Sequence, residues 1–85
     1  MRRISFLQKA FDDFVKWSNE DKKMYNRIVE LINDIQRSPF DGIGKPEPLR
    51  HQYKGLWSRR ITQEHRLIYE VRNEEIIIVQ CRLHY

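Results

Sequence analysis

The spacing of apolar residues along this chain limits the folds it can adopt. From Leu7 to residue 37 apolar side chains recur at helical intervals, and after residue 56 they alternate as in short strands. The first helix is predicted from Leu7 onward, on an apolar face that consists of Leu7, Ala10, Phe11, Phe14, Val15 and Trp17. Ser18 and Asp21 then resemble a capping box between two helices. A second helix ends before Ser38-Pro39, because the residue before proline disfavours helix.

Three strand patterns follow, at residues 57–62, 66–72 and 75 to about 83, and residues 2–7 are also compatible with a strand. The order β-α-α-β-β-β predicts an α+β fold in which two helices cover one face of a mainly antiparallel four-stranded sheet. Eighty-five residues support one hydrophobic core. We therefore expect residues 1–85 to form a single domain.

The charge and composition of the sequence indicate which kinds of partner the protein can bind. The formal net charge is +4, and the segment 45–66 is rich in cations: Lys45, Arg50, Lys54, Arg59, Arg60 and Arg66 against Glu47 and Glu64. Such a segment favours a polyanionic partner. The single cysteine, Cys81, has no partner for an internal disulfide and is predicted to be a buried apolar residue. The sequence shows no membrane span and no signal peptide, so we expect a cytoplasmic protein without membrane association.

Side-chain alternation in the last three strands predicts a cationic open face. The set predicted to face the helices comprises Leu67, Tyr69, Val71, Ile77, Val79, Cys81 and Leu83. The uncovered face is predicted to carry Ser58, Arg60, Thr62, Arg66, Ile68, Glu70, Gln80, Arg82 and His84. Ile76 and Ile78 share the parity of His84, so part of this face is expected to be apolar or covered. Guanidinium groups gathered in this way can bind the oxygens of a phosphodiester and stabilise charge that develops during its cleavage.

Two further side chains complete a possible catalytic set for RNA. Glu47 lies between Pro46 and Pro48, which restrict its backbone to extended conformations. If this loop folds over the sheet, Glu47 can accept the proton of a ribose 2′-hydroxyl, and His84 can protonate the departing 5′-oxygen. The three histidines and Cys81 are not spaced as metal ligands, so the sequence predicts a mechanism without metal or cofactor.

Four sequence segments resemble those of the YoeB (Txe) family of bacterial toxins, within the RelE/ParE superfamily. They are residues 44–49 (GKPEPL), 55–61 (GLWSRRI), 64–69 (EHRLIY) and 81–85 (CRLHY). The resemblance extends over the whole chain. It implies a RelE-like microbial RNase fold and a ribosome-dependent endoribonuclease that cleaves translated mRNA in the ribosomal A site. It also implies a homodimer and a YefM-like antitoxin that holds the toxin inactive.

The resemblance implies roles for individual residues. The carboxylate of the family corresponds to Glu47, its transition-state arginine to Arg66, and its terminal pair to His84 and Tyr85. Arg60 corresponds to a further arginine that contacts phosphate. Arg50 stands where many relatives carry lysine, which keeps the charge and changes the geometry. The residues expected to bind substrate are Lys45, Arg50, Arg60 and Arg82.

Several alternatives remain open from sequence. The chain can be a ParE-like toxin that binds a protein target such as gyrase, or a plain RNA-binding module. Arg66 can pair with Glu64 or Glu70 instead of phosphate. Arg59 is predicted to lie at an edge or to contact a partner, and His65 to be a solvated turn residue. The role of Tyr85 can be base stacking, proton chemistry or dimer packing.

Overall fold

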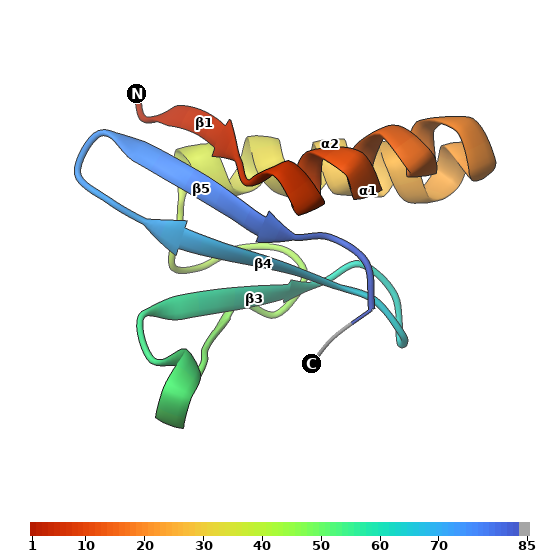
Figure 1. Cartoon of the computed structure of the whole chain (residues 1–85). Helices are drawn as coiled ribbons and strands as arrows, with labels where there is room; N and C mark the ends of the chain where they lie inside the picture. Colours follow the sequence, from red (N-terminus) through yellow and green to blue (C-terminus); the bar gives the residue numbers. More distant parts are fainter. Residues whose placement is uncertain (84–85) are drawn as a thin grey trace.

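The computed structural model describes residues 1–83, and two helices lie across one face of a twisted sheet (Figure 1). The chain begins with strand β1 (Arg3–Phe6), followed by helices α1 (Gln8–Glu20) and α2 (Lys22–Arg37). A long loop leads to the short strand β2 (Glu47–Pro48) and a 3₁₀ turn, η1 (His51–Tyr53). Strands β3 (Leu56–Arg60), β4 (Arg66–Val71) and β5 (Glu75–Gln80) complete the fold.

Both helices form where the apolar periodicity predicts them. The second ends at Arg37, directly before Ser38-Pro39, as predicted. The predicted capping box is wrong. Asp21 alone caps α2, because its carboxylate accepts from the backbone N–H groups of Lys23 and Met24. Ser18 lies inside α1, and its hydroxyl donates to the carbonyl oxygen of Val15.

The sheet has five strands in the order β1-β5-β4-β3-β2. β1 is parallel to β5 and every other pair is antiparallel, which confirms the mainly antiparallel α+β fold. The prediction of four strands omitted β2, which pairs with β3 through only two residues, Glu47 opposite Ser58 and Pro48 opposite Trp57. This edge strand tolerates proline because few of its N–H groups are needed in the ladder.

The hydrophobic core lies between the helices and one face of the sheet, where Leu67 and Tyr69 of β4 are fully buried. In β5 the predicted alternation is wrong. Ile76 and Ile78 face the core, whereas Ile77 lies opposite Glu70 on the open face. The register shifts at the point where Ile68 pairs with Gln80 and Tyr69 with Ile78, which leaves Val79 as an extra residue. This bulge reverses the side-chain parity of the strand.

Beyond the bulge, Cys81 returns to the core, as predicted. Its thiol is fully buried and donates to the carbonyl oxygen of Ala10 at 3.5 Å. Burial raises the pKa of Cys81 to about 12, so the thiol stays protonated at neutral pH. Among the helices of residues 1–83, none is long and apolar enough to cross a membrane.

Candidate functional site

Glu47 reaches the open face because of its register in β2. It lies directly opposite Ser58, and directly opposite residues of an antiparallel pair share one face of the sheet. Arg60, two residues after Ser58, is on that same face and is therefore a diagonal neighbour of Glu47, and diagonal neighbours lie about 7–8 Å apart, within reach of long side chains. Glu47 and Arg60 are both exposed. The structure thus brings the predicted carboxylate beside a predicted phosphate-binding arginine.

Arg66 joins them from the neighbouring strand. It lies directly opposite Arg60 in the β3–β4 ladder, which places two guanidinium side chains on the open face at one end of the sheet. Directly opposite residues have Cβ atoms about 4.5–5.5 Å apart. Glu47, Arg60 and Arg66 therefore form a cluster on three adjacent strands, with one acid and two cations.

The remainder of the open face differs in charge. Glu70 and Glu75 lie towards the other end of β4 and β5, where Glu70 pairs with Arg72 and Glu75 lies opposite Arg3. Ser58 and Ile68, opposite each other between these ends, are buried. An anion is therefore attracted to the end of the sheet that carries the two arginines.

Arg66 is held by the hairpin that precedes its strand. One guanidinium nitrogen, Nη1, donates to three backbone carbonyl oxygens, those of Thr62 (2.6 Å), Gln63 (3.0 Å) and His65 (3.1 Å). The two carboxylates proposed as alternative partners contact other residues: Glu64 lies beside His65, and Glu70 pairs with Arg72. The guanidinium of Arg66 is therefore oriented by neutral carbonyl groups, and among residues 1–83 no carboxylate forms an ion pair with it.

Arg59 occupies the opposite face of the same strand, and its predicted edge position is wrong. Its side chain is fully buried and forms an ion pair with Asp34 of α2, with 2.6 Å between Nη1 and Oδ2. The hydrogen bond from Arg59 holds the pKa of the Asp34 carboxyl below its ordinary value. Burial raises the pKa of Tyr69, whose hydroxyl accepts from Arg59 Nε at 3.2 Å. The loop that leads to Glu47 closes on this buried cluster.

His65 fixes the segment before the last two residues, and its predicted solvated position is also wrong. Its ring is largely buried and lies edge-on to Trp17, with 5.0 Å between ring centres. Nδ1 accepts from the backbone N–H of Leu83 at 2.8 Å, and the carbonyl oxygen of Leu83 accepts from the N–H of Arg66 at 3.0 Å. The predicted acid His84, and Tyr85, lie outside the described residues.

The sequence matches the model of a family described as "YoeB-like toxin of bacterial type II toxin-antitoxin system" over residues 6–85. Toxin YoeB of Escherichia coli (strain K12) is 47% identical over 83 residues, which cover 98% of this chain and 99% of that relative. The chain belongs to the YoeB toxin family.

Two solved structures from Staphylococcus aureus share the fold of this YoeB-family chain. A YoeB dimer aligns with a TM-score of 0.92 and 44% identity, covering 99% of this chain and 98% of the other. A YoeB-YefM complex aligns with a TM-score of 0.91 and 42% identity, covering 100% of this chain and 99% of the other. These similarities extend over both helices and the whole sheet.

Three more predicted site residues have different surroundings. Lys45 and Arg50 are exposed and flank β2, two residues before and two residues after it. The prediction that Arg82 lies on the open face is wrong. Its guanidinium turns to α1, where it pairs with Glu20 at 3.0 Å and lies 4.2 Å from the ring centre of Trp17. Leu83, predicted to face the core, is 51% exposed.

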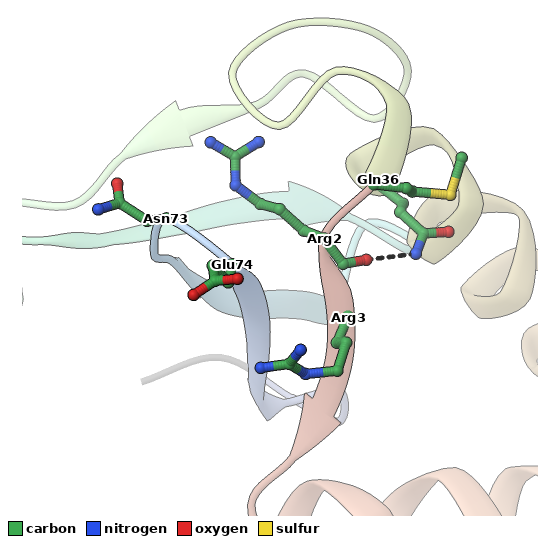
Figure 2. A pocket seen from close by; sticks show the side chains of 6 residues that line it. Arg2, Arg3, Gln36, Asn73 and Glu74 are labelled. Atoms are coloured by element: carbon green, nitrogen blue, oxygen red, sulfur yellow. Dashed lines mark hydrogen bonds between the residues drawn. The ribbon is translucent and has the colours of Figure 1, made fainter.

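A polar pocket of about 400 Å³ lies away from this cluster, at the opposite end of β4 (Figure 2). It is lined by the N-terminal residues, the C-terminal end of α2 and the β4–β5 turn, and Gln36 reaches across it to the backbone of Arg2. Arg2 and Arg3 share this pocket with Glu74, so its charges are mixed. Among residues 1–83, no group of three His, Cys, Asp or Glu side chains is arranged to hold a metal ion.

Proposed function

We propose that this YoeB-family chain is an endoribonuclease that cleaves translated mRNA in the ribosomal A site and thereby inhibits translation. One observation carries the proposal: Glu47, Arg60 and Arg66 meet on three adjacent strands of the uncovered sheet face. A carboxylate beside two guanidinium groups supplies a proton acceptor and two phosphate ligands in one cluster. The resemblance of residues 81–85 to the family supports His84 as the remaining proton donor.

The reaction follows from these groups. The Glu47 carboxylate removes the proton of a ribose 2′-hydroxyl, and the 2′-oxygen attacks the adjacent phosphorus. Arg66, with Arg60, stabilises the extra negative charge on the pentacoordinate phosphorane. The bond from phosphorus to the 5′-oxygen then breaks, and His84 donates a proton to that oxygen. The products are a 2′,3′-cyclic phosphate and a 5′-hydroxyl, and no redox step or cofactor is needed.

We extend the proposal to two protein partners and a binding role for the surrounding cations. A YefM-like antitoxin and a second copy of the chain are supported by the Staphylococcus aureus complexes of similar fold. Lys45 and Arg50 flank the strand of Glu47 and are exposed, so they can contact neighbouring phosphates of the mRNA. Arg82 contributes only if its pair with Glu20 opens, because its guanidinium faces α1.

The proposal is tested by mapping RNA ends. Purified protein is added to ribosomes paused on a defined mRNA, and primer extension locates any cut while end-specific ligation identifies the terminal phosphate. We expect cuts at the A-site codon that leave a 2′,3′-cyclic phosphate, and none in the same mRNA without ribosomes. Growth arrest with intact mRNA and damaged DNA would instead support a ParE-like toxin that acts on a protein target.

A further inference from the structure

The guanidinium of Arg59 uses all five of its N–H groups inside the protein. Nε donates to the hydroxyl of Tyr69, and the other four N–H groups donate to a single stretch of chain, residues 34–43. The acceptors there are Asp34 Oδ2 (2.6 Å) and the carbonyl oxygens of Ser38 (2.6 Å), Asp41 (3.0 Å) and Ile43 (3.0 Å). A planar guanidinium with five donors matches this set completely, and an ammonium with three donors does not.

This cluster holds the loop that carries Glu47. Tyr69 adds a direct bond, because its hydroxyl donates to the carbonyl oxygen of Pro39 at 2.7 Å. Asp34 Oδ2 also accepts from the N–H of Ile43 at 3.1 Å. At Gly42 a Cβ atom would lie 2.1 Å from that same oxygen, so the loop approaches Asp34 too closely for a side chain there.

The segment that connects this buried cluster to Glu47 is short. Only three residues separate Ile43 from Glu47, and they are Gly44, Lys45 and Pro46. The carbonyl oxygen of Gly44 accepts from the N–H of Arg60 at 2.7 Å. Arg59 therefore lies between the two residues of β3 that fix the site: Ser58, which is opposite Glu47, and Arg60 itself.

We propose that Arg59 is a positioning residue, which sets the place of Glu47 relative to Arg60 and Arg66 from the far side of the sheet. Arg59 does not contact substrate, since its side chain is fully buried on the helix face. It acts through its hydrogen bonds to residues 34–43, which connect that segment to the strand that carries Arg60. The inference rests on the proposed function for its effect on catalysis, and on the loop contacts alone for its effect on structure.

Two variants and one control test the inference. Arg59→Lys retains the charge but loses two donors, and Tyr69→Phe retains the ring in the core but removes the hydroxyl that joins Arg59 to Pro39. Arg37→Lys is the control, because Arg37 contacts the same Asp34 from the solvent side, at 3.2 Å and 67% exposure. Cleavage of ribosome-bound mRNA is followed in single turnover over a range of protein concentrations.

We expect Arg59→Lys to lower the maximal rate on the order of 10–100-fold. We expect Tyr69→Phe to lower it about 3–10-fold. The half-saturating concentration stays unchanged, and the control behaves as wild type. In a Glu47→Gln background, Arg59→Lys is expected to cause no further loss, since it acts through Glu47. An undiminished loss in that background, or a folded Tyr69→Phe variant with wild-type rate, would overturn the inference.

Hydrogen exchange supplies a readout that does not need RNA. The amides of Ile43 and Arg60 donate to Asp34 and Gly44, so both are expected to exchange faster in Arg59→Lys and in Tyr69→Phe, while amides within α1 stay protected. If the loop amides keep wild-type protection in Tyr69→Phe, the positioning role is wrong. If exchange changes as expected but the wild-type protein cleaves no mRNA, only the proposed function fails.

Discussion

Arg60 and Arg66 face each other directly across the β3–β4 ladder, on the side of the sheet that the helices leave uncovered. Like charges in directly opposite positions destabilise a sheet by about 0.2–1 kcal/mol. The free protein carries this unfavourable interaction, and we expect a phosphate bound by both guanidinium groups to offset it. The pair therefore links a small loss of stability to the binding of an anion.

Neutralising one arginine is expected to have opposite effects on stability and on anion binding. Arg60→Gln should raise the free energy of unfolding by about 0.2–1 kcal/mol, because the repulsion with Arg66 is removed. The same change should weaken binding of the mRNA and reduce the salt dependence of that binding. Urea unfolding and binding titrations at several salt concentrations measure both. A variant that is less stable than wild type and binds equally well would contradict this explanation.

The buried pair of Arg59 and Asp34 is expected to make stability depend on pH. The pKa of Asp34 is lower in the folded state than the unfolded value of about 3.9. Its contribution is therefore present above pH ~4 and is lost as the pH falls through the folded-state pKa. Asp34→Asn should cost about 3 kcal/mol at pH 7, because the buried guanidinium loses its counter-charge.

The control for this prediction is again Arg37→Lys, which should change stability by less than about 0.5 kcal/mol because that pair is exposed. Urea unfolding at pH 7 and at pH 3 measures both variants. The difference in the free energy of unfolding between Asp34→Asn and wild type should be smaller at the lower pH. A gap of equal size at both pH values would show that Asp34 contributes through packing alone.

The order of the elements along the chain, except β2, and the end of α2 followed from the sequence because they depend on local periodicity. The open-face placement of Arg60 and Arg66 also followed, since β3 and β4 alternate regularly over these residues. The faces of the β5 side chains did not follow, because Val79 adds one residue to a strand whose four central residues are isoleucine or valine. Nothing in such a uniform run marks the bulge, and every side chain before it was assigned to the wrong face.

The predicted positions of Arg59 and His65 were wrong for a different reason. Their partners lie far away in sequence: Asp34 is 25 residues from Arg59, and Leu83 is 18 residues from His65. Alternation in β3 gives Arg59 the parity opposite to Arg60, but neither Arg59 nor a histidine in a turn shows locally which groups will bury it. For Arg59, a sequence signal was the pair of glycines in the loop, Gly42 and Gly44, because glycine often marks a close approach of the backbone. In the structure both have positive φ values and lie close to Asp34 or Arg59.

His65 is expected to be needed for activity although it lies outside the cationic cluster. His65→Phe keeps an aromatic ring against Trp17 but removes the nitrogen that accepts from Leu83. Loss of one hydrogen bond should lower the cleavage rate about 3–10-fold, because the segment before His84 is less well fixed. His51→Asn, at an exposed histidine, is the matched control. Equal rates for both variants would disprove this role.

Stepwise shortening of the chain is expected to separate the two terminal residues. Removal of Tyr85 should weaken cleavage, and removal of both Tyr85 and His84 should abolish it, because the second deletion takes away the proposed proton donor for the 5′-oxygen. Thermal unfolding of each truncated protein provides the control for folding. Equal activity of the two truncated proteins would argue against an acid role for His84.

The central claim is that Glu47 and His84 act as base and acid on a phosphate held by Arg60 and Arg66. Its most direct test is the single-turnover rate of cleavage of ribosome-bound mRNA by Glu47→Gln and His84→Ala. General acid–base catalysis contributes about 10²–10⁴-fold, so each variant should be slower by a factor in that range and should still bind the ribosome. Cleavage at the wild-type rate by both variants would contradict the claim.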